Sequence, residues 1–209
     1  MQNLFLVHPE ITQIKANIIS RRSQGENTQL ILDRTIFLPK TDMTIKERGN
    51  ISGLDLISVE EKKDNIIHLV KGKPSKSEVI LNLNYDDRLR NLSYNSAFVL
   101  FNIVMKSFYN FKDIKLSLTD ELANMEIEDF FDVFDPRLIE DQMNFIIQKS
   151  LPITSQKGIT NIYPIGDTIN NGICFDNTSK IRAFKILYQE YQSNNLYIEF
   201  FAGSDILNL

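Results

Sequence analysis

The chain has 209 residues, of which 43% are hydrophobic and 24% are charged, and its net charge is −4. This composition is typical of a globular protein and excludes a largely disordered chain, while the acidic balance argues against a general nucleic-acid-binding domain, which is usually basic. No apolar run reaches the length of a membrane span, and the first residues lack the pattern of a signal peptide. The single cysteine excludes an internal disulfide bond, so we expect a cytoplasmic protein without membrane contact.

The first part of the chain is predicted to consist of short strands. Apolar residues alternate with polar ones over residues 12–20, and strands are also expected at 28–37, 50–61, 65–72 and 77–84. Turn-forming stretches containing glycine or proline separate these segments. Many short strands with frequent turns predict a small barrel or sandwich, which we place at residues 1–85.

The second part, residues 86–209, mixes helices with strands and is predicted to be an α+β module. Helices are expected over residues 93–109, which are apolar on nearly all sides, and over 135–151, where Pro136 stands near the start. Strands are expected at 113–118 and, joined by a turn, within 183–203. The acidic and aromatic run 125–135 is interpreted as a connecting segment with its phenylalanines packed inward.

One face of the first helix carries an unusual set of residues. Asn95, Val99, Asn102 and Lys106 recur at helical spacing, so a partly polar stripe runs along an otherwise apolar helix. Elsewhere, Cys174 lies in a turn-rich segment, where a cysteine most commonly fills space as a small buried side chain. The alternative is that Cys174 is a nucleophile paired with His68. His68 lies in the middle of a strand, where we expect it to be packed and hydrogen-bonded.

Four segments, taken in chain order, resemble a known family. They are "LILDRTIFLPKTDMTIKERGNI", "NIIHLVKG", "NYDDRLRNLSYNSAFVLF" and "INNGICFDNTSKIRAFKI". Together they are similar to the editing domain of alanyl-tRNA synthetase and to its free-standing relatives, the AlaX-type proteins. The matching positions are Asp33, Thr35, Phe37, Pro39 and Gly49 in the first segment, and Gly172, Asn177, Thr178 and Ile181 in the last.

This resemblance implies a fold and an activity. Family members combine a small N-terminal β-barrel with an α+β domain that threonyl-tRNA synthetases share, and they hydrolyse the ester of tRNA(Ala) charged with serine or glycine. The resemblance therefore implies tRNA as partner, and we take Lys46, Arg48, Arg88 and Arg90 as candidate tRNA contacts, although a solvated rim of mixed charge is the alternative. The chain is too short to be a full synthetase.

The family's zinc ligands are two histidines spaced four apart on a helix, a cysteine and a further histidine. At the corresponding positions this sequence has Asn95, Val99, Asn170 and Cys174. Valine cannot bind zinc and asparagine is a poor ligand, so we expect no zinc and no other cofactor.

Other parts of the implied substrate pocket are kept. Thr35 stands at the family's amino-acid-discriminating threonine, and Ser96 keeps the character of the helix motif. By resemblance the pocket is formed by Thr35, Asn95, Ser96, Asn170 and Cys174. Three functions remain open: a metal-free deacylase, a non-catalytic module that binds tRNA or a synthetase, and an unrelated use of the same fold.

Overall fold

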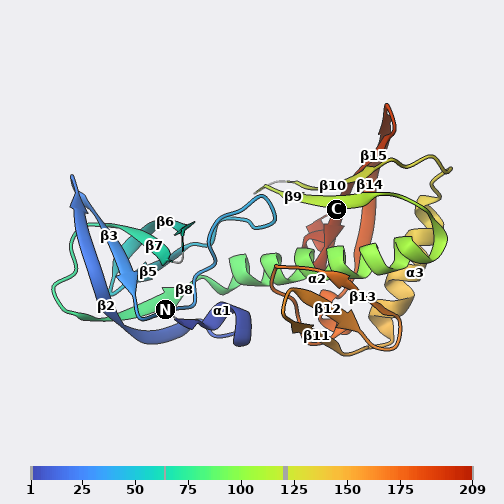
Figure 1. Cartoon of the computed structure of the whole chain (residues 1–209). Coiled ribbons are helices and arrows are strands. Elements are labelled where there is room, and N and C mark those ends of the chain that lie inside the picture. The colour runs from blue at the N-terminus through green and yellow to red at the C-terminus, as the bar shows by residue number, and fades with distance from the viewer. Residues whose placement is uncertain (1, 64, 120–121, 209) are drawn as a thin grey trace. The chain divides into compact units, whose positions relative to one another are not determined.

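The computed structural model describes residues 2–63, 65–119 and 122–208 and has two compact units, Met1–Leu89 and Arg90–Leu209. We call them the N-terminal and the C-terminal unit. Most elements are strands, and helices α1 (Leu4–Val7), α2 (Tyr85–Phe108) and α3 (Pro136–Gln148) complete an α+β structure, as predicted (Figure 1). Within these residues no helix is both long enough and apolar enough to cross a lipid bilayer.

The strands of the N-terminal unit form a closed barrel in the order β2-β3-β7-β6-β5-β8. The ring closes because the long strand β2 pairs with β8 through its first half and with β3 through its second, with a register shift between Ile18 and Ser20. Alternation places one side of each strand inside, as in β3, where every second residue is buried. The strands are β2 (Gln13–Gln24), β3 (Asn27–Leu32), β5 (Gly49–Ile51), β6 (Leu54–Lys62), β7 (Asn65–Lys71) and β8 (Glu78–Leu83), and β1 (Gln2–Asn3) pairs separately with β4 (Arg34–Thr35).

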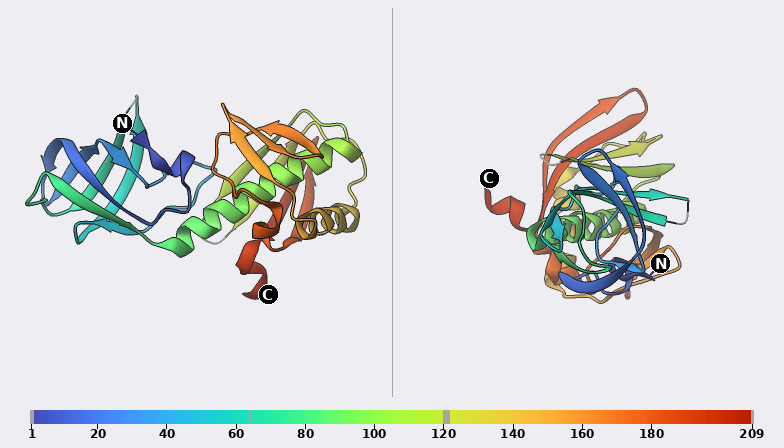
Figure 2. Two further views of the ribbon diagram at one scale, coloured as in Figure 1. Left: turned by 90° about the horizontal axis from the view of Figure 1, so that it is seen from below. Right: turned by 90° about the vertical axis from the view of Figure 1, so that its left-hand side faces the viewer.

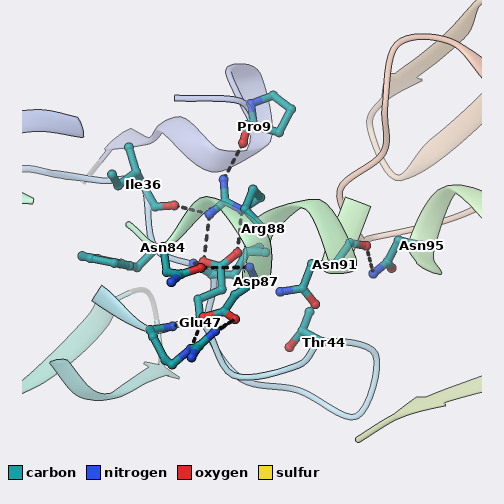
Figure 3. A network of polar contacts seen from close by, with 12 residues as sticks. Pro9, Ile36, Thr44, Glu47, Asn84, Asp87, Arg88, Asn91 and Asn95 are labelled. Atoms are coloured by element: carbon teal, nitrogen blue, oxygen red, sulfur yellow. Dashed lines mark hydrogen bonds and ion pairs between the residues drawn. The ribbon is translucent and has the colours of Figure 1, made fainter. Parts of the chain in front are cut away.

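A buried ion pair joins the start of α2 to the barrel loops of the N-terminal unit. The side chains of Arg88 and Glu47 are both 0% exposed, and the Arg88 guanidinium donates to both carboxylate oxygens of Glu47 at 2.5 and 2.8 Å. The guanidinium also donates to the carbonyl oxygens of Pro9 and Ile36 (Figure 3). This pairing satisfies a charge that would otherwise be very costly to bury.

The C-terminal unit places α2 between two sheets. One sheet has the order β14-β15-β10-β9, and the other, β11-β12-β13, lies on the opposite side of the helix (Figures 1 and 2). Their strands are β9 (Asp113–Leu118), β10 (Ala123–Glu128), β11 (Ile153–Gln156), β12 (Ile159–Ile162), β13 (Gly166–Ile169), β14 (Phe184–Gln192) and β15 (Asn195–Ala202), with short 3₁₀ helices η1 (Thr178–Ile181) and η2 (Gly203–Asn208).

The two sides of α2 meet chemically different neighbours. Tyr94 and Phe101 are seven residues apart, so they share one face of the helix, where they pack against Phe200 and Phe184 of the larger sheet. The polar stripe lies on another face, toward β13 and the segment that follows it. The helix is therefore buried on several sides, which is why its apolar residues show no single stripe.

Three details differ from the sequence predictions. Helix α2 begins at Tyr85 rather than 93, because the Asn84 side chain accepts the first backbone N–H groups, those of Asp86 and Asp87. Strands β11 to β13 were not predicted. The run expected to be a connecting segment overlaps the last four residues of β10, and while Phe130 and Phe134 are buried as expected, Phe131 is 74% exposed.

We predict that Glu47→Leu lowers the free energy of unfolding of the full chain by about 3–5 kcal/mol, because it leaves the Arg88 charge buried without its partner. Urea denaturation measures this. Replacing both residues, as in Glu47→Leu with Arg88→Met, should cost less than the single change. As a control, Lys15→Ala removes an exposed ion pair with Glu78 and should lower the free energy of unfolding by less than about 1 kcal/mol. If Glu47→Leu lowered it no more than this control does, the prediction would be contradicted.

Candidate functional site

The polar stripe of α2 forms hydrogen bonds with β13 inside the C-terminal unit. The Thr168 hydroxyl donates to the Asn102 side chain at 3.1 Å, and Lys106 Nζ lies 3.4 Å from the same hydroxyl oxygen. Two turns earlier on the helix, Asn95 donates its amide to the Asn91 carbonyl at 3.0 Å, a bond within α2. The stripe therefore meets β13 at its C-terminal end.

Five side chains form what we call the polar cluster: Asn95, Ser96, Thr160, Asn170 and Cys174. The Asn170 amide nitrogen lies 3.3 Å from both the Cys174 sulfur and the Thr160 hydroxyl. The Ser96 hydroxyl accepts the backbone N–H of Phe175 at 2.9 Å, which fixes the Cys174 segment to α2. The four candidate residues of the C-terminal unit, distant in sequence, thus lie together in the structure.

Gly172 brings Asn95 into this cluster. A Cβ placed on Gly172 would overlap the side-chain oxygen of Asn95, so only glycine permits this approach. The Gly172 N–H also donates to the Asn170 side-chain oxygen at 3.0 Å. The turn that carries Asn170 and Cys174 is thereby held against the polar stripe.

The chemistry of the polar cluster is that of uncharged groups. Burial raises the pKa of the Cys174 thiol to about 12, and hydrogen bonds from Ser96, Asn170 and Thr160 offset this only in part. The thiol is therefore protonated at neutral pH, and the thiolate is the form that attacks carbonyls and binds metals. In the structure the Cys174 sulfur accepts a hydrogen bond from the Asn170 amide.

This donor set does not fit a zinc ion. Of the four positions at which the resemblance implies ligands, Val99 has no donor atom, Asn95 and Asn170 have amides, and Cys174 alone has a side chain that binds zinc well. The Asn170 oxygen is also taken by Gly172. Within the described parts of the chain, no three His, Cys, Asp or Glu side chains gather as a metal would require.

Thr35 belongs to the N-terminal unit and has a different partner. Its hydroxyl lies 2.8 Å from Nε2 of His68, and it accepts the backbone N–H of Phe37 at 3.1 Å. Nδ1 of His68 lies 3.4 Å from the Leu30 carbonyl. His68 is thus packed and hydrogen-bonded as expected, and both ring nitrogens are occupied, so it has none left to serve as a base for Cys174.

The candidate tRNA contacts have unequal surroundings. Lys46 and Arg48 are exposed, although Arg48 pairs with Asp87 at 2.7 Å. Arg90 is partly exposed and pairs with Asp205 at 2.9 Å. Arg88 has no exposed surface and is bound to Glu47, so it does not fit the predicted contact, and we leave it out of the proposals below.

Two threonines of the site escaped the sequence prediction. Thr160 and Thr168 face each other across β12 and β13, and both are buried. They were missed because these strands have only four residues each. The available signal was a short β-branched segment between turn-forming glycines, Gly158 and Gly166.

Comparison with known proteins gives one informative similarity. No family model matches the chain. The chain is 26% identical to the alanyl-tRNA editing protein AlaX-L of Pyrococcus horikoshii, in an alignment that covers 97% of this chain. The chain spans 58% of the length of this curated relative. The similarity extends over nearly the whole chain and supports the resemblance found in the sequence motifs.

We predict that iodoacetamide labels Cys174 of the folded protein at pH 8 at least about 100-fold more slowly than it labels the chain unfolded in urea. With a pKa near 12 the thiolate fraction at pH 8 is about 10⁻⁴, whereas an ordinary thiol is ionised to roughly a quarter. Mass spectrometry over time measures the rate.

The matched control is Ser23→Cys in a Cys174→Ser background, because residue 23 is exposed. This cysteine should be labelled rapidly in the folded protein. Folded-state labelling of Cys174 at the rate of the control would show that the thiol is reactive and would overturn our account of the polar cluster.

Proposed function

We propose that this chain is an editing-domain-related protein that recognises aminoacyl-tRNA and hydrolyses the ester of tRNA(Ala) charged with serine or glycine. The observation that carries the proposal is the polar cluster. Four of its five members come from α2 and from the segment after β13, the places where the resemblance implies the family's site, and the bond from Phe175 N–H to Ser96 holds those two segments together. The similarity to an alanyl-tRNA editing protein supports the substrate class.

The proposal includes the finer fold assignment. The closed barrel of the N-terminal unit corresponds to the family's small β-barrel domain, and the C-terminal unit to the α+β editing domain that threonyl-tRNA synthetases share. The proposed location of the protein is the cytoplasm. Lys46, Arg48 and Arg90 are proposed to contact the tRNA backbone, since exposed cations neutralise phosphates.

Hydrolysis in this proposal proceeds without zinc, because the donor set does not fit the metal. Ester hydrolysis develops negative charge on the carbonyl oxygen, and preorganised N–H and O–H donors stabilise that charge. Side-chain amides supply such donors, and Asn95 and Asn170 are the amides of the polar cluster. We therefore assign oxyanion stabilisation to Asn95 and support of that residue to Gly172.

One observation favours a second candidate, a non-catalytic module that binds tRNA or a synthetase. An efficient general base has a pKa near the working pH. The polar cluster consists of two asparagines, a serine, a threonine and a thiol whose pKa is about 12. None of these groups is such a base, so activation of water would have to come from a group outside the cluster.

The test is deacylation of tRNA(Ala) charged with serine, glycine or alanine, with metal content measured on the same protein. We expect hydrolysis of the seryl and glycyl esters above the buffer rate, unchanged by chelator. Asn95→Ala should lower the seryl rate by about 10²-fold, the usual effect of removing one oxyanion donor. Asn110→Ala, at an exposed position, is the matched control.

The same preparation separates the two candidates. Binding of tRNA that weakens with salt, without turnover of any ester, would support the non-catalytic module and reject the deacylase. Neither turnover nor binding at low salt would reject both. About one equivalent of zinc per chain would contradict the metal-free part of the proposal.

A further inference from the structure

Exposed cations from two neighbouring segments lie at one end of the barrel in the N-terminal unit. One segment is the hairpin formed by the second half of β2 and β3, and the other is the loop 72–77 between β7 and β8 (Figures 1 and 2). The Gly72 N–H donates to the Glu26 carbonyl in the hairpin turn at 2.9 Å. At the other end of the loop, the Ser77 carbonyl accepts the Ile18 N–H of β2 at 2.8 Å. We call the exposed cations of these segments the basic end: Arg21, Arg22, Lys71, Lys73 and Lys76.

The pairing of the strands places two of these cations on the same outer face. Arg22 stands opposite Gln29, and Lys71 stands opposite Asn27, two residues away on β3. Opposite residues of an antiparallel pair share a face, as do alternate residues of one strand. Thr28, which lies between the two β3 positions, is buried inside the barrel, so Arg22 and Lys71 point outward. From the spacing of strands and residues, their Cα atoms are on the order of 12 Å apart.

The cations of the basic end are not neutralised by carboxylates. Among the residues that the structure describes, none of the five forms an ion pair. Of the nearby carboxylates, Glu78 is paired with Lys15, and Glu26 is exposed in the hairpin turn. A cation that is already paired has to leave its partner before it can bind a phosphate. That is the position of three arginines considered above as tRNA contacts: Arg48, Arg88 and Arg90.

A hollow beside Arg22 adds hydrogen-bonding groups to this charge. Its volume is about 260 Å³, and its other lining residues are Ser23, Gln24 and Gln29. The Gln29 amide donates to the Gln24 side-chain oxygen at 2.9 Å, which orders both side chains. Arginine, serine and glutamine side chains are among those that proteins use to bind the phosphates and sugars of nucleic acids. Because all four lining residues are polar, the hollow suits a sugar–phosphate backbone rather than a lipid surface, which binds through an apolar face.

We propose that the basic end of the barrel is an RNA-binding surface that holds the sugar–phosphate backbone and reads no base. Arg22 and Lys71 neutralise phosphates, and the hollow beside Arg22 receives one of them. Contacts of this kind position a nucleic acid without carrying sequence information. That the RNA is a tRNA rests on the proposed function.

This surface lies at the opposite end of β8 from Arg48. Strand β8 begins directly after the loop 72–77, and its last residue is followed by Asn84, whose N–H donates to the Arg48 carbonyl at 2.9 Å. The six residues of β8 span about 17 Å. The basic end therefore contacts a different part of a bound RNA from the part that Arg48 contacts.

The first experiment measures the affinity of the full chain for uncharged tRNA(Ala) at several salt concentrations, so it needs neither an ester nor turnover. The double variant Arg22→Gln with Lys71→Gln removes two exposed charges. It should weaken binding at least about tenfold at about 50 mM salt, and it should reduce the slope of log affinity against log salt by about 1.5, the contribution of two phosphate contacts.

The matched control is Arg137→Gln with Lys149→Gln, which removes two exposed charges from the C-terminal unit. Since both double variants change the net charge equally, a loss confined to the first assigns binding to the basic end. Glu26→Gln is a third variant, which removes a negative charge beside the surface and should tighten binding about twofold. Its backbone carbonyl, which holds Gly72, is retained.

The outcomes separate this inference from the proposed function. With circular dichroism showing folded proteins, no weakening by Arg22→Gln with Lys71→Gln, or equal weakening by the control, would overturn the inference. So would loss of binding to vesicles of equal parts phosphatidylcholine and phosphatidylserine with tRNA binding unchanged, which would assign the surface to a membrane. Weakened tRNA binding in the first variant, in a protein that hydrolyses no ester, would reject the deacylase and leave the inference standing.

Discussion

The arrangement of the C-terminal unit depends on one constraint: helix α2 has to satisfy an aromatic sheet on one face and a polar turn on another. Tyr94 and Phe101 meet the phenylalanines of β15 and β14, which requires an apolar face. Asn95 and Ser96 meet the segment containing Gly172 and Cys174, where backbone groups need partners. Residues on one helix face are three or four positions apart, so the sequence decides which side chains face the sheet and which face the turn. Exchanging the two faces would leave polar atoms of the turn without hydrogen-bond partners. The site is where it is because the helix is held from both sides.

The polar cluster is held together by hydrogen bonds between neutral groups. A buried polar group without a partner costs free energy, so hydrogen bonds inside the cluster matter for its stability. Asn170 bonds Cys174, Thr160 and Gly172, and the valine at position 99 needs no such partner. Pairing among neutral groups fits the high pKa of Cys174.

The sequence predicted much of this structure, and the parts it missed have physical reasons. Alternation located the strands of the N-terminal unit because one side of each strand is buried, and Pro136 after the capping Asp135 marked the start of α3. Strands β11 to β13 were missed because a strand of four residues is too short to show a clear alternation of polar and apolar residues. The role of Arg88 was misjudged because a charge is normally exposed, and only the tertiary structure shows that Glu47 receives it. Four of the five residues of the polar cluster followed from the resemblance, whereas Thr160 and the hydrogen bonds within the cluster are seen only in the three-dimensional structure.

Binding of tRNA and hydrolysis of its ester make separate chemical demands. Hydrolysis needs an activated water, and no member of the polar cluster is a base with a pKa near 7. His68 supplies none to the cluster either, because it is fully buried in the barrel and hydrogen-bonded to Thr35. The proposed deacylase therefore needs a general base from outside the cluster, whereas the proposed binding module needs none. That difference in chemistry, rather than the family resemblance, separates the two candidate functions.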